Sequence, residues 1–400
     1  MGIIYNIFYA LALTVYLPVF IFLTKKRGYS PDLKDRFVLH KRENRNAVWF
    51  HCASVGELNV ARPLIEYLKR ENKILITVSS PRGKKYAEKT YPFATVRTVP
   101  FDLSFLIKRF VRIHRPSTLI VVEGELWFNL ITVTSKFIPV ISVNTRISPS
   151  SYRIYRKIKP FYAKILNSFS LLIVRTETDR NYLKEFVKDK NKIVMCGDLK
   201  FVSSKSAKTV NIKKEGKLLI AGSTHFPEEE IILKIFKNLK KEFPDLRLIT
   251  APRHLERVPE IIKLAEENNL TYSLRTETDQ LKTDVYILDT VGELSGFYRY
   301  ADVVFVGGTF APVGGHNILE AILENRPVVI GKSHHKIKDT VEQIIRTGFL
   351  KTASNEEELE KHIRSFLIEK PPEIDFSEIS EKVYRCYINN LKGVIYGDNR

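Results

Sequence analysis

The sequence predicts an α/β protein with two Rossmann-like, doubly wound domains that face each other across a cleft, preceded by an N-terminal membrane-anchor helix. Three features support this prediction: an uncharged apolar segment at the start, a long alternation of strand-like and helix-like segments, and an interruption after which the alternation resumes. The length of 400 residues is too great for one ordinary core and suits two domains. With 44% apolar and 27% charged residues, the chain has the composition of a folded globular protein.

The first segment, residues 1–27, is predicted to anchor the chain in a membrane. Residues 3–23 carry no charged side chain and are long enough to cross a bilayer core of about 30 Å as a helix. A cleavable signal peptide usually has basic residues before its apolar run, whereas here the basic residues 25–27 follow it. By the positive-inside bias, these charges keep the remainder of the chain in the cytoplasm. Pro18 can bend the helix, so the sequence leaves open whether it spans the bilayer or lies partly in one leaflet.

The chain is strongly basic, with a formal net charge of +19. No nucleic-acid recognition motif accompanies this charge, so nucleic acid is not an expected partner. Beside a membrane anchor, the charge favours attraction to an anionic membrane surface, although a solvated basic surface is the plainer alternative. The basic residues gather after the anchor and near the middle of the first domain: Lys25, Lys26, Arg27, Lys34, Arg36, Lys41, Arg42, Arg45, Arg153, Arg156, Lys157, Lys159 and Lys164.

The three cysteines, Cys52, Cys196 and Cys386, lie far apart in the sequence and form no CxxC pair. This spacing argues against a zinc site and against a disulfide framework. It also fits a reducing compartment such as the cytoplasm.

The first domain, residues 28–201, is predicted to hold a parallel, doubly wound sheet. Its strand-like segments are rich in β-branched residues and end at turns or charges, while 57–70 and 104–114 carry apolar residues at helical spacing. Such alternation is typical of a parallel sheet with crossover helices. No GxGxxG follows the first strand, which argues against a dinucleotide-binding oxidoreductase. The predicted strands are residues 48–53, 74–79, 118–123, 139–144 and 171–176.

A linker and a second α/β domain follow. Residues 202–216 lack apolar periodicity and are predicted to be the linker. The alternation then resumes over residues 217–375, and an apolar pattern from 376 to 396 predicts a closing helix within residues 376–400. The predicted strands of the second domain are residues 217–223, 246–252, 284–289, 301–308 and 326–331.

Acidic residues follow two strands of the first domain. Glu57 comes after the first strand and a small-residue loop, at the edge of the sheet where ligands bind in parallel folds. An acid favoured by the helix dipole in the first helical turn explains Glu57 equally well. Glu123 and Glu125 end another strand, where one is a candidate functional acid and the other a cap or ion-pair partner. If Glu123 lies close to Glu57, repulsion between the carboxylates raises one of their pKa values.

The second domain offers groups that suit an anion and a sugar. Ser223 and Thr224 follow its first strand and either hold a phosphate at a helix N-terminus or act as an ordinary helix cap. Arg253 follows the next strand and presents a planar fork for a phosphate or carboxylate, with His254 as a second donor or a surface residue. The loop 305–321 contains two glycine pairs, which make its backbone flexible, and leads into a helix containing Glu320. Such an arrangement directs backbone amides toward an anion and allows the Glu320 carboxylate to bind sugar hydroxyls.

Taken in order, the segments ASVGE, VVEGELWFN, VNTRIS, GDLKF, AGSTH, APRH, TVGEL and VGGTFAPVGGHNILE resemble the 3-deoxy-D-manno-octulosonic acid (Kdo) transferases of lipopolysaccharide synthesis. The matching segments cover nearly the whole chain, and VGGT…GGHNxLE and ASxGE are the most specific. The resemblance implies a GT-B fold and an inverting glycosyltransferase that uses CMP-Kdo as donor and the lipid A precursor (lipid IVA) as acceptor, with no metal or other cofactor. It also implies attachment to the inner membrane with both catalytic domains on the cytoplasmic side.

The resemblance further implies roles for individual residues. Glu57 would be the catalytic base, Glu123 a second essential acid and Lys200 a catalytic lysine. In this mechanism Glu57 accepts the proton of the acceptor hydroxyl, while Lys200 and Arg253 stabilise the departing phosphate. The residues expected to bind the CMP donor are Ser223, Thr224, His225, Pro252, Arg253, Val291, Gly292, Glu293, Gly315, His316, Asn317, Ile318, Leu319 and Glu320.

Other functions stay open on the sequence alone. Another GT-B enzyme with a UDP-sugar donor and a lipid acceptor is the nearest, and the GGHNxLE segment and the Glu57 loop weigh against it. A sugar-nucleotide epimerase of the same fold would leave the anchor and the basic residues without a purpose. A catalytically inactive membrane adaptor would keep its function after Glu57→Ala, Glu123→Ala or Lys200→Ala, and the presence of all three groups at matching positions argues against it.

Overall fold

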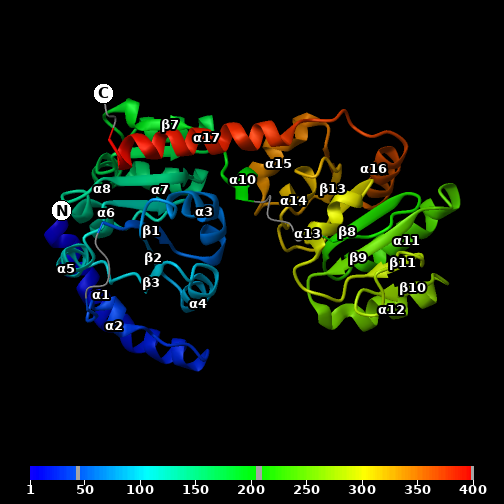
Figure 1. The fold of residues 1–400 in the computed structure, drawn as a ribbon, viewed down its shortest axis with the longest axis horizontal. Coiled ribbons are helices and arrows are strands. Elements are labelled where there is room, and N and C mark those ends of the chain that lie inside the picture. The colour runs from blue at the N-terminus through cyan, green and yellow to red at the C-terminus, as the bar shows by residue number, and fades with distance from the viewer. Residues whose placement is uncertain (42–45, 204–209, 398–400) are drawn as a thin grey trace. The chain divides into compact units, whose positions relative to one another are not determined.

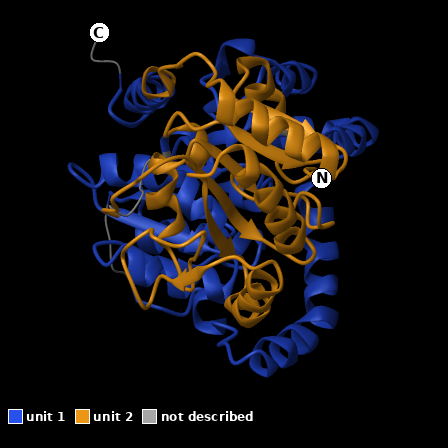
Figure 2. Cartoon of the chain, turned by 90° about the vertical axis from the view of Figure 1, so that its right-hand side faces the viewer, with its two compact units in different colours: residues 1–203, 380–400 blue, residues 204–379 orange. Residues whose placement is uncertain are grey.

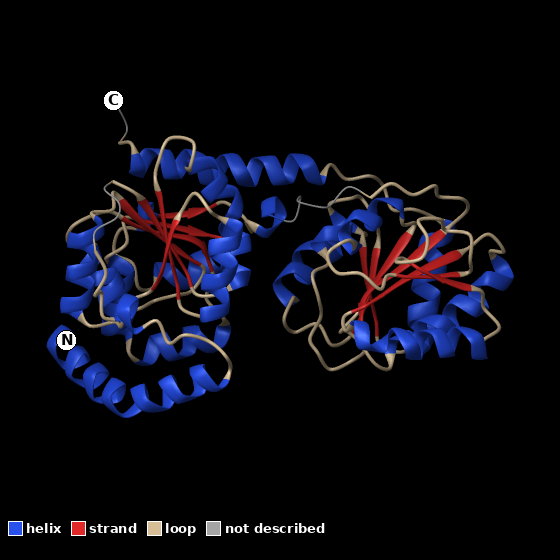
Figure 3. Ribbon diagram, turned by 60° about the horizontal axis from the view of Figure 1, so that its bottom comes forward, coloured by secondary structure: helices blue, strands red, loops and turns tan. Residues whose placement is uncertain are grey.

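The computed structural model describes residues 1–41, 46–203 and 210–397. The chain divides into two compact units, of which unit 1 combines residues 1–203 with 380–400 and unit 2 comprises residues 204–379 (Figure 2). Each unit contains one parallel seven-stranded sheet flanked by helices (Figure 3). The predicted α/β architecture with two doubly wound sheets is therefore confirmed. Residues 204–209 of the expected linker, as well as Arg42 and Arg45, lie outside the described residues.

The sheet of unit 1 has the strand order β3-β2-β1-β4-β5-β6-β7, so the order reverses between β1 and β4. Figure 1 labels β1, β2 and β3, which follow one another on one side of the reversal. All neighbouring strands run parallel. In open sheets of this kind, ligands bind beyond the carboxyl ends of the strands at the point of reversal. The strands are β1 (Val48–Cys52), β2 (Ile74–Val78), β3 (Thr95–Thr98), β4 (Thr118–Val122), β5 (Val140–Thr145), β6 (Leu171–Val174) and β7 (Ile193–Met195).

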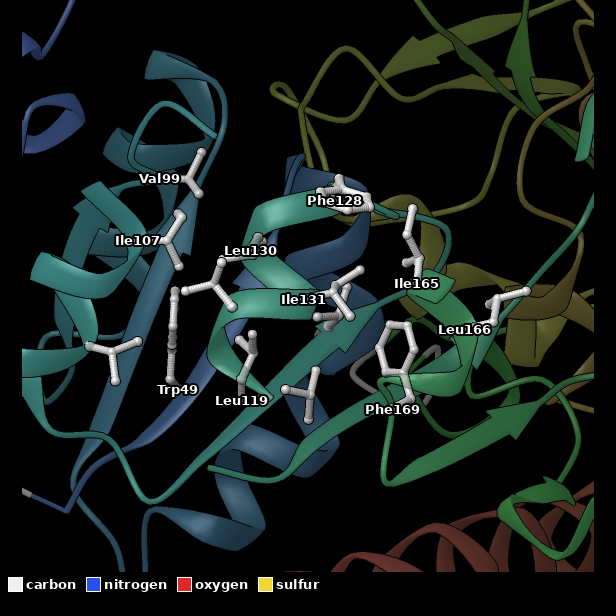
Figure 4. Close-up of a cluster of buried hydrophobic side chains, with 14 of the residues drawn as sticks. Trp49, Val99, Ile107, Leu119, Phe128, Leu130, Ile131, Ile165, Leu166 and Phe169 are labelled. Carbon is white, nitrogen blue, oxygen red and sulfur yellow. The ribbon is translucent and has the colours of Figure 1, made fainter. Parts of the chain in front are cut away.

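Side chains of the unit 1 strands alternate between two hydrophobic cores, one on each face of the sheet. Trp49 and Leu119 lie in the core where Ile131 and Phe169 pack (Figure 4), whereas Phe50 lies in the other. Because β1, β2, β4 and β6 are buried on both faces, their sequences read as nearly continuous apolar runs. The helices that follow the strands are α3 (Val55–Leu68), α4 (Pro81–Thr90), α5 (Ser104–His114), α6 (Phe128–Thr134), α7 (Pro149–Lys157), α8 (Lys159–Asn167), α9 (Glu177–Lys184) and α10 (Lys200–Ser203).

The apolar N-terminal segment forms helix α1 (Gly2–Lys26), which is long and apolar enough to cross a membrane. One side of this helix packs on the first core of unit 1 through Tyr5, Tyr9, Leu13 and Leu17. The spacing of four residues places these side chains along one face of a helix. The opposite side is exposed, and its apolar side chains are Ile3, Ile4, Ile7, Phe8, Leu11, Val15, Val19 and Phe22.

The short helix α2 (Leu33–Arg36) follows α1 and corrects one detail of the predicted basic surface. The Arg36 side chain, expected among the headgroup-binding cations, is buried. Its guanidinium donates to the carbonyls of Pro31, at 3.3 Å, and Ser79, at 2.9 Å. Arg36 therefore stabilises unit 1 instead of binding headgroups, because two backbone carbonyls and the rings of Phe20 and Phe101 take the place of water around its guanidinium.

Unit 2 repeats the architecture with the strand order β10-β11-β9-β8-β12-β13-β14, which reverses between β8 and β12. Its strands are β8 (Leu218–Thr224), β9 (Arg247–Pro252), β10 (Tyr272–Leu274), β11 (Val285–Ile287), β12 (Val303–Val306), β13 (Val328–Gly331) and β14 (Leu350–Ala353). Its helices are α11 (Glu228–Glu242), α12 (Val258–Glu267), α13 (Leu294–Phe297), α14 (Leu319–Ile322), α15 (Lys338–Ile344) and α16 (Glu356–Ile368).

The predicted closing helix is α17 (Phe376–Ile395), and from Ser380 onward it belongs to unit 1. Its Tyr387 hydroxyl donates to the Gly197 carbonyl at 3.0 Å. Cys386, one residue earlier, forms a disulfide with Cys196, with the two Cα atoms 5.6 Å apart. The expectation that the cysteines form no disulfide is therefore wrong, because the return of α17 joins residues 190 positions apart. The cysteine spacing consequently carries no information about the redox compartment.

Candidate active site

The candidate catalytic residues of unit 1 lie at the reversal point of its sheet. Glu57 follows β1, and Glu123 follows β4, the strand that pairs with β1 on the other side of the reversal. Lys200 begins α10 shortly after β7. The doubly wound topology thus brings the two carboxylates from distant parts of the sequence to neighbouring strand ends at one edge of the sheet, a proximity that the sequence left open.

Glu57 occupies the third position of α3, where it closes the N-terminus of the helix. Ser54 is the N-cap, and its hydroxyl oxygen accepts from the Glu57 amide at 3.3 Å. In return, the Glu57 carboxylate accepts from the Ala53 amide at 2.6 Å and from the Ser54 hydroxyl at 3.3 Å. This reciprocal pattern is close to a capping box, so the structural explanation of Glu57 holds in part.

The electrostatic surroundings of Glu57 differ from those of an ordinary cap. Its pKa is raised to about 7, first by burial and then by the negative charges of Glu125 and Glu123, against the opposing hydrogen bond from Ala53. Glu358 provides an internal comparison, because it caps α16 from the same position and its carboxylate accepts from the Ser354 amide at 2.7 Å. That hydrogen bond lowers the pKa of Glu358. The capping position alone therefore does not raise the pKa of a glutamate. The pKa of Glu57 is raised by burial and by the carboxylates of Glu123 and Glu125, which form a carboxylate cluster with it.

Glu123 lies in a strained turn and contacts a lysine and an amide. Its φ angle is +59°, and that of Asn144 on the neighbouring strand is +53°, values that non-glycine residues adopt rarely. The Asn144 side-chain amide donates to Glu123 at 3.4 Å, and Lys200 Nζ lies 3.8 Å from the same oxygen, Oε1. The Asn144 oxygen accepts from the Leu199 amide at 2.9 Å, which ties the turn before Lys200 to this cluster. Glu123 and Lys200 therefore form one ion pair at the sheet edge.

Glu125 is the second acid of the same turn and has different partners. Its Oε2 accepts from the Trp127 indole N–H at 2.7 Å and lies 4.0 Å from His51 Nε2. His51 is fully buried, and burial lowers its pKa to about 4, so it faces Glu125 as a neutral ring near pH 7. The three glutamates thus divide their partners: Glu57 has amide and hydroxyl donors, Glu123 has lysine, and Glu125 has an indole.

In unit 2, eight of the expected donor-binding residues line one pocket at the carboxyl edge of the sheet. Its empty space, including the mouth, is about 970 Å³. Arg253 contributes the cation, while Glu320 contributes an acid whose pKa is raised by burial. The Asn317 amide donates to Glu320 at 3.0 Å, which orients that carboxyl group. The eight residues are Ser223, Pro252, Arg253, Val291, Gly292, His316, Asn317 and Glu320.

The other expected donor-binding residues do not line this pocket. Thr224, Ile318 and Leu319 are buried. Glu293 forms an ion pair with Arg275 at 3.3 Å. His225 stacks on His316 with 2.8 Å between their Nε2 atoms, so it packs directly against a pocket residue. Gly315 lies in a left-handed turn with its amide bonded to the Gly308 carbonyl.

Glu228 is a site residue that the sequence analysis missed. Its fully buried carboxylate accepts from five backbone amides, those of His225, Gly308, Thr309, Phe310 and Ala311, at 2.8–3.2 Å. It therefore holds the first glycine pair of the 305–321 loop against the end of β8. The His225 amide is consumed in this way, so it is not open to a phosphate. Glu228 was hidden because it is one of three consecutive glutamates in the first turn of α11.

Tyr298 also lines the pocket without having been predicted. Burial raises its pKa well above the usual range, so its hydroxyl stays protonated. Gly222 lies against it, and a Cβ atom at that position would stand 2.3 Å from the hydroxyl oxygen. The glycine of AGSTH is therefore required by this close approach. Among the described residues, no three His, Cys, Asp or Glu side chains are arranged to hold a metal ion.

Comparison with known proteins gives two family matches that meet at the boundary of the units. A family described as 3-deoxy-D-manno-octulosonic-acid transferase (kdotransferase) matches residues 31–203, and one described as glycosyl transferases group 1 matches residues 204–383. The 3-deoxy-D-manno-octulosonic acid transferase of Aquifex aeolicus is 36% identical over 356 residues, which cover 88% of this chain and 95% of that protein. The enzyme of the same name from Haemophilus influenzae is 30% identical over 340 residues, 81% of this chain and 79% of that protein.

Solved structures share the fold at much lower identity. A putative UDP-N-acetylglucosamine 2-epimerase from Listeria monocytogenes matches with a TM-score of 0.58 and 14% identity, over 89% of this chain and 98% of that one. Similarity at this identity shows the common two-unit architecture and says nothing about the reaction.

Proposed function

Because this chain belongs to the 3-deoxy-D-manno-octulosonic acid (Kdo) transferases and is thus a glycosyltransferase, we propose that it transfers Kdo from CMP-Kdo to the lipid A precursor, with Glu57 as the general base. The observation that carries the assignment of the base is the raised pKa of Glu57, about 7, within the carboxylate cluster. A base with a pKa near the working pH is both deprotonated in a large fraction of molecules and basic enough to accept a proton. The reaction is a direct displacement in which the acceptor oxygen attacks the anomeric carbon as its proton passes to Glu57.

The cations and the second acid have separate tasks in this proposal. Negative charge builds on the departing CMP phosphate, and Lys200 and Arg253 stabilise it. Glu123 holds the Lys200 ammonium at 3.8 Å, which keeps the lysine at the sheet edge. Positive charge builds on the sugar ring, as in other glycosyl transfers, and the glutamate cluster favours it. Unit 2 binds the nucleotide in the pocket that contains Arg253 and Glu320.

The acceptor is proposed to reach unit 1 from the membrane to which helix α1 attaches. Tyr5, near one end of the helix, donates to Asp102 at 2.7 Å, and Phe20, near the other, lies 4.8 Å from the Arg36 guanidinium. The two contacts are 15 residues apart, or about 22 Å along the helix. A helix packed on unit 1 over that length cannot cross the bilayer without drawing Asp102 and Arg36 into hydrocarbon, which is costly. We therefore propose that α1 lies along the cytoplasmic surface of the inner membrane, with its exposed side in one leaflet.

The test is transfer of Kdo from CMP-Kdo, generated in situ, to tetraacyl lipid A precursor. Wild-type protein should form product, Glu57→Ala should lower kcat by roughly 10²–10⁴-fold, and Glu358→Ala should be as active as wild type. Glu358 is a matched control because it caps its helix from the same position without a raised pKa. Folded wild-type protein that makes no product would overturn the proposed donor and acceptor. Equal activity of Glu57→Ala and wild type would leave the reaction in place but remove Glu57 as its base.

A further inference from the structure

A second, smaller hollow lies in unit 1 at the carboxyl edge of the sheet. Its empty space, including the mouth, is about 380 Å³, far less than that of the nucleotide pocket. The wall contains Ser79, which follows β2, the segment 99–102 that follows β3, and Trp127, beyond the end of β4. The hollow therefore belongs to the edge of the sheet where ligands bind in this topology, next to the reversal point.

The wall of the hollow is mainly apolar, and its charged groups are already engaged by other residues. Val99, Phe101 and Leu130 contribute hydrocarbon surface, and the aromatic residues Tyr9 and Trp127 complete the wall. The two charged side chains in the wall are already engaged. Asp102 accepts from the Tyr5 hydroxyl and from the amides of Asn129, at 3.0 Å, and Leu130, at 2.7 Å.

The second charged group is Arg36, whose guanidinium donates to two backbone carbonyls and lies over the rings of Phe20 and Phe101. The Ser79 hydroxyl is the one buried polar atom of this wall without a hydrogen-bond partner among the described residues. A wall in which both charges are compensated attracts hydrocarbon rather than an ion.

The position of the hollow connects the membrane helix with the carboxylate cluster. Tyr9, in its wall, belongs to α1, whose other side is an exposed apolar surface. Trp127, also in its wall, donates its indole N–H to Glu125, and the charge of Glu125 raises the pKa of Glu57. A chain that leaves the bilayer beside α1 and enters this hollow would therefore carry its attached headgroup toward Glu57.

We propose that this hollow holds one hydrocarbon chain of the lipid acceptor and thereby positions the acceptor hydroxyl at Glu57; this rests on the proposed function. Burial of the chain supplies affinity in proportion to the apolar area removed from water. The hollow selects acylated over water-soluble acceptors, because the charged groups of its wall are already engaged and leave few hydrogen-bonding partners for a sugar. No covalent step takes place in it.

The first test fills the hollow and compares two acceptors. Val99→Phe should raise KM for tetraacyl lipid A precursor by about tenfold, the effect of excluding roughly two methylene groups. It should leave kcat/KM for the fully deacylated, water-soluble acceptor within about twofold of wild type. The control is Val96→Phe, because Val96 lies in the same part of the chain and is equally buried, at 7% exposure against 8% for Val99, but belongs to the opposite core. Equal effects of Val99→Phe on both acceptors, or none on either, would overturn the proposal.

The second test does not depend on turnover. The chain has two tryptophans, of which Trp49 is fully buried in the core and Trp127 lines the hollow. An acceptor brominated on its acyl chains should quench the Trp127 fluorescence of wild-type protein in detergent. Val99→Phe should abolish most of this quenching, and Trp127→Phe all of it. A brominated phospholipid in the same detergent measures quenching by lipid in general, and if it quenches as strongly as the acceptor, the proposal is wrong. Quenching by the acceptor without any Kdo transfer would keep the chain site and overturn the proposed reaction.

Discussion

At the scale of single residues, Glu57 and Glu358 occupy the same position in their helices, and yet their pKa values are shifted in opposite directions. Both are three residues beyond the N-cap, and both accept from the backbone amide that precedes the cap. The hydrogen bond prevails at Glu358 and lowers its pKa, whereas burial and two further glutamates prevail at Glu57 and raise it. The identity of the residue and its capping role are visible in the sequence. Whether the hydrogen bond or the burial and charge prevail depends on the residues that follow β4, more than sixty positions away.

The raised pKa predicts a specific pH dependence. Because the base must be deprotonated, kcat/KM should rise with pH through an apparent pKa of about 7. Glu125→Gln removes one of the negative charges that raise this pKa, so the rising limb should move to lower pH. Glu358→Gln serves as the control and should leave the profile unchanged. The measurement is the pH profile of kcat/KM for all three proteins, and an unshifted Glu125→Gln profile would mean that this coupling is absent.

Most of the candidate residues could be named from the sequence, but not the residues that hold them in position. Glu123 and Glu125 could not be separated by counting alternate residues, because the positive φ of Glu123 breaks the strand geometry on which the count depends. Glu228 gave no signal within its run of three glutamates, since only the folded loop shows which one the amides surround. Residues that act on another residue through space are hidden from one-dimensional patterns.

At the scale of elements, the four strands that the sequence missed are the edge strands of the two sheets. These are β3 and β7 in unit 1 and β10 and β14 in unit 2. Edge strands are short and partly exposed, so they lack the continuous apolar run that identified the ten other strands. β3, with the sequence TVRT, contains a single apolar residue, and only the burial of its side chains alternates over its four positions. A segment of four residues is too short for a sequence pattern to distinguish a strand from a loop.

Helix α1 shows the reverse difficulty, because its apolar residues surround the whole helix. The sequence therefore predicted its existence but not which side packs on unit 1. Tyr5→Phe should destabilise the protein by about 1 kcal/mol, since the Asp102 carboxylate loses one of its donors. Tyr16→Phe is the matched control, because Tyr16 belongs to the same helix but its side chain is exposed. Thermal unfolding in detergent tests this, and equal midpoints for the two variants would contradict the packing contact.

The disulfide makes a separate prediction for helix α17. Reduction of the Cys196–Cys386 bond should lower the free energy of unfolding by about 2–5 kcal/mol, because a long loop of the unfolded chain is released. Cys196→Ser should have the same lowered stability as the reduced wild type and should no longer respond to reductant. Denaturant unfolding with and without reductant provides the measurement, and a wild type insensitive to reductant would show that the bond adds nothing.

At the scale of the whole molecule, the two units share one doubly wound architecture and present different chemistry at the reversal point of each sheet. Unit 1 presents three glutamates and a lysine, whereas unit 2 presents a larger pocket with Arg253 and Glu320. The presence of two sheets was predictable, because the alternation of strands and helices begins twice in the sequence. Both sheets are parallel and doubly wound, but their strand orders differ: three strands stand before the reversal in unit 1 and four in unit 2. The likeness to solved structures at 14% identity concerns this two-unit architecture.

The division of labour can be tested with CMP alone. Arg253→Ala should weaken CMP binding by roughly 10–100-fold, the cost of one charge-assisted contact to phosphate. Glu57→Ala should leave CMP binding unchanged, because Glu57 belongs to unit 1. Isothermal titration with CMP measures both variants of the full-length protein. Comparable loss in both would show that nucleotide binding is not confined to unit 2.

The return of α17 has a consequence for the order in which the protein is made. A ribosome releases the chain from the N-terminus, so all residues of unit 2, which ends at residue 379, emerge before the last 21 residues of unit 1, residues 380–400. Unit 2 can fold while unit 1 still lacks its final helix, Tyr387 and the partner of Cys196. Helix α1 is synthesised before both sheets, and Cys386, which closes the disulfide, after both. Unit 1 therefore becomes complete only after the whole of unit 2 has left the ribosome.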